Sequence, residues 1–98
     1  MKNKYILKKK LPLRPYSKEE SECHKYATKK EIEKFGIKKF RKVMVLIPQN
    51  PDDMIGENTH KNIYISKVVP EKPAFLCEEI YYHEKMEQMC LKNKRKHN

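Results

Sequence analysis

Five residues have side chains that zinc favours as ligands, namely Cys23, His24, Cys77, His83 and Cys90. A structural zinc site usually contains a Cys-x-x-Cys pair, and no such pair occurs in the sequence. Of the three residues on the helix expected near the C-terminus, only His83 and Cys90, seven residues apart, share a face. The sequence therefore predicts no metal site, and the cysteines are interpreted as small apolar core residues.

Catalysis is the second kind of chemistry that these side chains allow. Glu79 and His83 lie four residues apart, so on a helix they would share a face and could form an acid/base pair. The same spacing gives an ordinary hydrogen bond between helical neighbours, and the His-Glu-x-x-His pattern is absent. Asp52, Asp53 and Glu57 lack the alternating spacing of a calcium loop and are interpreted as solvated turn residues. We therefore expect no catalytic residues, no enzyme activity and no cofactor.

The composition is dominated by positive charge. The 98 residues include 23 Lys and Arg against 13 Asp and Glu, for a net charge of +10. The local charge is +6 over residues 1–16, +4 over 17–50, −4 over 51–91 and +4 over 92–98. Basic segments bind polyanions because the contact releases condensed counterions, so the expected partner is nucleic acid or another polyanionic surface. A genome rich in lysine codons would give the same excess without such a partner.

Nucleic-acid binding through phosphate contacts is the leading functional prediction. Only three of the basic residues are arginine, whose forked side chain reads base edges, so phosphate contacts are favoured over base recognition. Phe35 and Phe40 are interleaved with lysines, an arrangement that allows either stacking on an unpaired base or burial in the core. The residues predicted to contact phosphates are Lys8, Lys9, Lys10, Arg14, Lys38, Lys39, Arg41, Lys42, Lys94, Arg95 and Lys96.

Two other classes of function stay open. The proline-braced stretch from Leu11 to Tyr16 favours a structural component of a larger assembly, such as a virus particle or a cytoskeletal lattice, docked on an acidic protein surface. The acidic segment 51–91 favours an inhibitor of a nucleic-acid-processing enzyme, which ranks last. Met86 and Met89 would also allow the last helix to dock on a partner protein.

The first half of the chain contains sequence signals for helices that would position these residues. Ser17 and Glu20 match a capping box, as do Thr28 and Glu31, and Gly36 is suited to a helix C-terminus. We expect short helices within 17–35, either separate or fused. The prolines before Ser17 exclude a helix there, so residues 1–16 are expected to form a basic extended arm.

A small sheet and a long helix are expected in the second half. Residues 39–47 end in a continuous apolar run and residues 62–69 alternate, which predicts two strands, paired antiparallel in the simplest topology. Residues 48–60 are rich in turn formers and predict a long exposed loop. A broad apolar face predicts a helix over about 74–92 that packs on the strands. The sequence thus predicts an α+β fold with basic flexible termini.

The expected organisation is one small domain over residues 17–91, with the arm before it and a basic disordered tail over 92–98. Three cysteines at irregular spacing do not make a disulfide framework, which indicates a reducing compartment. The basic residues 1–10 are not followed by an apolar stretch long enough for a signal peptide. The protein is therefore expected in the cytoplasm, the nucleus or a virion, not secreted and without a membrane partner.

Overall fold

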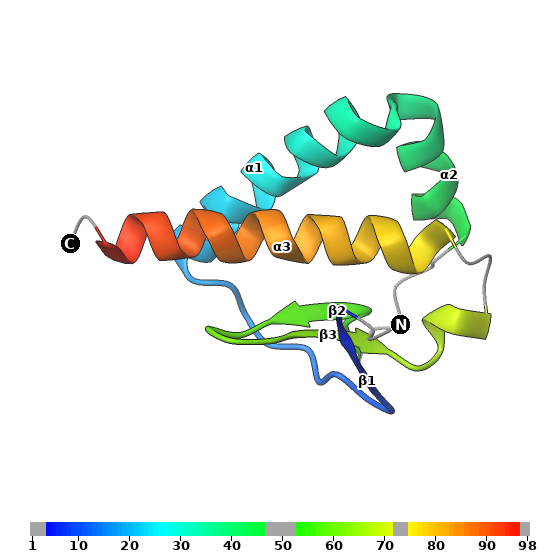
Figure 1. The fold of residues 1–98 in the computed structure, drawn as a ribbon, viewed down its shortest axis with the longest axis horizontal. Coiled ribbons are helices and arrows are strands. Elements are labelled where there is room, and N and C mark those ends of the chain that lie inside the picture. The colour runs from blue at the N-terminus through cyan, green and yellow to red at the C-terminus, as the bar shows by residue number, and fades with distance from the viewer. Residues whose placement is uncertain (1–3, 47–52, 72–74, 97–98) are drawn as a thin grey trace.

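The computed structural model describes residues 4–46, 53–71 and 75–96 and confirms the α+β class (Figure 1). A long helix, α3, lies between a pair of helices on one side and a small sheet on the other (Figure 1). The elements in chain order are β1 (Ile6–Lys8), α1 (Lys18–Phe35), α2 (Ile37–Leu46), β2 (Gly56–Asn58), β3 (Ile63–Ser66), a single-turn 3-10 helix η1 (Val69–Glu71) and α3 (Phe75–Lys96).

Helix α1 begins at the predicted capping box and continues without a break to Phe35. The Ser17 hydroxyl accepts a hydrogen bond from the Glu20 amide at 3.1 Å, and the Ser17 amide donates to the Glu20 carboxylate at 3.0 Å. The second capping-box sequence, at Thr28 and Glu31, lies inside α1 and does not begin a new helix. The Glu31 carboxylate contacts His83 of α3 instead. The short helices expected within 17–35 are therefore fused.

The strand predicted over 39–47 is wrong, because residues 37–46 form helix α2; Ile47 lies outside the described residues. Gly36 has a φ of +93°, which L residues rarely adopt, and this lets the chain turn sharply out of α1. The Phe40 amide then donates to the Gly36 carbonyl at 3.0 Å and starts a new helix. The apolar run fits a helix because Val43 packs into the core while Val45 is 78% exposed.

The sheet has three strands in the order β1-β3-β2. Strand β3 confirms the prediction for residues 62–69 in its central part, but its neighbours differ from the expected one. Strand β1 pairs with it in parallel, Ile6 beside Tyr64, and β2 pairs with it antiparallel, Gly56 beside Ile65. Strand β1 therefore comes from the segment expected to be an extended arm (1–16), and β2 comes from the segment expected to be an exposed loop (48–60).

Helix α3 confirms the predicted C-terminal helix and continues to Lys96, so residues 92–96 are helical where a disordered tail was expected. It contacts α1, β2, β3 and η1. Its buried face carries Cys77 and Ile80, which pack on Val43, Ile65 and Val69 to form the main apolar core. Gly56 allows β2 to approach closely, since a Cβ there would lie 2.8 Å from the Ile80 side chain.

Cys23 of α1 and Cys90 of α3 form a disulfide, which corrects the expectation that all three thiols stay reduced. The two helices run antiparallel, and their packing brings the two Cα atoms to 5.6 Å, within the range that a disulfide spans. Cys77 is a free, buried cysteine, as the interpretation of a core residue required. The Cys23–Cys90 pairing results from the packing of α1 against α3, and the spacing of the cysteines in the sequence does not indicate it.

The disulfide should contribute strongly to stability, because it joins residues 67 positions apart and restricts the unfolded chain. We expect Cys23→Ser or Cys90→Ser to lower the free energy of unfolding of the oxidised protein by about 2–4 kcal/mol. Urea unfolding followed by circular dichroism measures the loss. Reductant should destabilise the wild type and the control Cys77→Ser but leave the other two variants unchanged. Equal midpoints for reduced and oxidised wild type would contradict the prediction.

Candidate functional site

Ten of the eleven basic residues predicted to contact phosphates fall into three groups that the fold does not join, and the eleventh, Arg14, lies in the segment before α1. Lys8, Lys9 and Lys10 lie at the end of β1 and just after it, the second group lies on α2, and the third lies in the last turns of α3 (Figure 1). No single basic face therefore contains all of the predicted residues.

Several of these residues are engaged with carboxylates of the same chain. The Arg14 guanidinium lies 2.7 Å from Glu20 and 3.6 Å from Glu57. The side-chain hydrogen bond from Arg14 lowers the pKa of Glu20, against a smaller opposing effect of burial. Lys10 lies 3.9 Å from Asp53, and Lys94 lies 2.5 Å from Glu22. The contacts of Arg14 and Lys10 hold the segment before α1 against its own domain, and the contact between Lys94 and Glu22 joins α3 to α1.

Helix α2 presents an exposed basic surface. It has no acidic residue, and Lys38, Arg41 and Lys42 are exposed. The Lys39 ammonium lies 5.2 Å from the centre of the Phe35 ring. Phe35 itself packs edge-on against Tyr82 of α3, so this ring is shared between the core and the basic surface.

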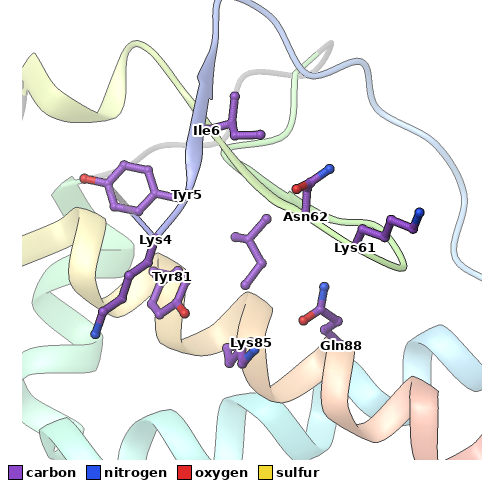
Figure 2. Close-up of a pocket in the computed structure, with 9 residues that line it drawn as sticks. Lys4, Tyr5, Ile6, Lys61, Asn62, Tyr81, Lys85 and Gln88 are labelled. Atoms are coloured by element: carbon purple, nitrogen blue, oxygen red, sulfur yellow. The ribbon is translucent and has the colours of Figure 1, made fainter. Parts of the chain in front are cut away.

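A basic cleft that the sequence did not reveal lies between β1, the turn before β3 and α3 (Figure 2). It has a volume of about 170 Å³. Lys4 from just before β1, Lys61 from the turn before β3 and Lys85 from α3 contribute to its walls, together with the amide side chains of Asn62 and Gln88. None of the described residues that line it is acidic. No local motif joins these lysines, because they meet only in the folded chain.

A second and larger cavity, of about 400 Å³, lies between the segment before α1, the helices and β2. One wall is apolar and includes Phe40, Val43, Met54, Ile55 and Ile80. Its lining also includes the polar, titratable side chains of His24, Glu31, His83 and Glu84. Such a combination of apolar walls and a few convergent polar groups is typical of ligand sites.

The polar part of this lining is organised around the ring of His83. Its Nδ1 atom lies 2.8 Å from Oε1 of Glu31 on α1. Its Nε2 atom lies 2.8 Å from Oε1 of Glu87 on α3 and 3.2 Å from Nδ1 of His24 on α1. His24 Nδ1 lies 3.8 Å from the same Glu87 oxygen. Two carboxylates and a second imidazole therefore surround one buried ring.

Burial and charge shift the pKa values of this group in opposite directions. Burial lowers the pKa of His83, but the contacts with Glu31 and Glu87 outweigh it and raise the value to about 10. Burial acts to raise the pKa of Glu87, yet His24 and His83 hold it below its usual value. Burial raises the pKa of Glu84 to about 7, helped by the charge of Glu87, although the Asn58 amide donates to Glu84 at 2.9 Å.

The expected hydrogen bond between Glu79 and His83 is not formed, because His83 turns toward Glu87 and Glu31. Glu79 is fully buried, and neither of its carboxylate oxygens has a hydrogen-bond partner. Sequence reasoning also missed Glu31, Glu84 and Glu87. The four-residue spacing of His83 and Glu87 was the one local signal available, and it is common on solvated helices.

Comparison of the chain with protein-family models, curated proteins and solved structures finds no match. The part of the chain that the structure describes contains no helix with the length and apolar character needed to cross a membrane.

The buried Glu79 carboxyl should give stability a characteristic pH dependence. Desolvation, with a smaller effect of Glu31, raises the pKa of Glu79 to about 7, while Lys39 opposes the shift. The native state therefore holds this proton more tightly than the unfolded chain, and stability falls as pH rises from about 4.5 to 7.

Replacing Glu79 by Gln removes this dependence, so the variant should gain about 3 kcal/mol over the wild type between pH 4 and pH 8. Urea unfolding at the two pH values measures the difference. Glu78→Gln, the exposed neighbour, is the matched control and should show no such gain. A Glu79→Gln difference that is the same at both pH values would refute the prediction.

Proposed function

We propose that the protein binds nucleic acid through phosphate groups, with little preference for base sequence. The observation that carries the proposal is the basic cleft of Figure 2, whose lining includes lysines from three separate parts of the chain and no carboxylate among the described residues. A phosphate bound at this cleft would lie near these ammonium groups and near the polar side chains of Asn62 and Gln88, whose amide nitrogens also donate to the Tyr64 hydroxyl and the Thr59 carbonyl. Lysines act as point charges, which suits backbone contacts better than base recognition.

The distribution of the acidic side chains supports the same proposal. Glu31, Glu79, Glu84 and Glu87 are buried, whereas no described lysine or arginine is buried. The surface is therefore more basic than the composition alone indicates. The exposed lysines of α2 and those at the end of β1 offer further phosphate contacts outside the cleft.

A double variant, Lys61→Gln with Lys85→Gln, tests the cleft. We expect it to bind a mixed-sequence single-stranded oligonucleotide about 10-fold more weakly than the wild type at low salt. The slope of log affinity against log salt should also become shallower by about 1.4, because two phosphate contacts are lost. Fluorescence anisotropy over a salt series provides both quantities.

The control is Lys25→Gln with Lys92→Gln, which removes the same charge from exposed positions outside the cleft. It should keep an affinity close to that of the wild type. An equal loss in the control would show that net charge alone acts, and a wild type that does not bind at low salt would end the proposal.

A second candidate is docking on an acidic protein surface as part of a larger assembly. The segment before α1 favours it, because Leu13 is 57% exposed and Tyr16 is 44% exposed beside Arg14. The two candidates separate on nuclease treatment of protein isolated from its source. Retention in a proteinaceous assembly after the nucleic acid is digested supports docking, and release supports nucleic-acid binding.

A further inference from the structure

We propose that His24, His83 and Glu87 bind a divalent transition-metal ion beside the larger cavity. This site is separate from the basic cleft and does not depend on the proposed nucleic-acid function. Three potential ligand atoms converge here: Nδ1 of His24, Nε2 of His83 and Oε1 of Glu87. Two imidazoles and one carboxylate form a ligand set that zinc and related ions accept.

The separations of the three atoms match those in a tetrahedral site. Metal–nitrogen and metal–oxygen bonds of about 2.0–2.1 Å place neighbouring ligands about 3.3 Å apart. The observed separations are 3.2 Å between the two histidine nitrogens, and 2.8 and 3.8 Å from these nitrogens to the glutamate oxygen. These values lie on both sides of the tetrahedral one, so a metal ion requires shifts of only about 0.5 Å.

The hydrogen bonding of the cluster is incomplete without a cation at its centre. Oε1 of Glu87 is buried and accepts no hydrogen bond, although it lies 2.8 Å from His83 Nε2. The Glu87 side chain is only 4% exposed, so solvent does not compensate for the missing partner. A metal ion at the centre of the three atoms would satisfy this oxygen and both ring nitrogens together.

Glu31 completes the arrangement as a positioning residue. It accepts from Nδ1 of His83 at 2.8 Å, which fixes the ring with Nε2 toward His24 and Glu87. A carboxylate on the far nitrogen of a metal-binding histidine is the usual outer contact of such sites. A metal ion at Nε2 would take the place of the proton that this nitrogen holds beside Glu87, and that proton would be released to solvent, while Nδ1 goes on donating to Glu31.

The surrounding fold holds the ligands in place and leaves access from one side. His24 follows the disulfide-bonded Cys23, and Glu87 lies three residues before Cys90, so the cross-link fixes the two ligand-bearing turns together. His24 and His83 both line the cavity of about 400 Å³. The fourth coordination position therefore faces that cavity, where water or a small ligand has room to bind.

Zinc titration of the untagged, oxidised protein tests the site, with isothermal titration calorimetry as the readout. We expect one equivalent to bind with a dissociation constant in the micromolar range or below. His24→Ala should weaken binding at least 10-fold and is expected to fold, because its side chain is 46% exposed. His60→Ala is the matched control, since His60 is exposed and is not one of the three ligands, and it should bind as the wild type does.

Two further measurements identify the ligands. With cobalt(II) as the probe, the visible absorption of the wild type should indicate tetrahedral coordination and should be lost in His24→Ala. Glu31→Gln should keep this absorption but lower the affinity about 10- to 100-fold, as expected for a positioning residue. Cys77→Ser should bind normally. The proposal is overturned if the wild type does not bind zinc, if His24→Ala binds as tightly as the wild type, or if Cys77→Ser abolishes binding.

Discussion

The antiparallel contact between α1 and α3 is the constraint on which the rest of the structure depends. It is joined by the Cys23–Cys90 disulfide, by the pair of Glu31 and His83, and at its outer end by Glu22 and Lys94. With α3 fixed against α1, its other side is left to cover β2 and β3. The helix pair thus determines where the sheet packs and where both clefts open.

The charged groups inside this contact are not expected to stabilise the fold more than apolar side chains would. A buried ion pair often stabilises a protein no more than well-packed apolar residues, because each charge loses its hydration. Here Glu79 and Glu84 are buried as well, and Glu79 has no hydrogen-bond partner. Groups with strongly shifted pKa values beside a cavity are more typical of functional sites than of structural cores. The Cys23–Cys90 disulfide lies beside this cluster and helps to hold its two helices together.

Local signals in the sequence were sufficient for some elements and not for others. The hydroxyl of Ser17 and the carboxylate of Glu20 act within one helical turn, so the start of α1 could be predicted. The apolar face of α3 was likewise visible in its spacing. The apolar run at the end of α2 has the sequence pattern of a buried strand. The turn at Gly36 and the packing of Val43 in the core favour a helix instead.

The candidate sites could not be predicted, because their residues come together only through tertiary packing. His83 meets Glu31 across 52 positions and His24 across 59. The lysines of the basic cleft come from three separate parts of the chain, and the cysteine pairing depends on the alignment of two helices. Composition could indicate a basic protein, but not which lysines share a cleft.

The central position of α3 also has a consequence for the order in which the chain can fold. The other elements emerge from the ribosome before α3, yet α1, β2, β3 and η1 all pack against it. Strand β1 likewise cannot pair until β3, more than 50 positions later in the chain, has been synthesised. The nascent chain therefore cannot bury its core until residues 75–96 have been synthesised. Until then its apolar surfaces are exposed, and its lysine-rich composition helps to keep the unfinished chain from aggregating.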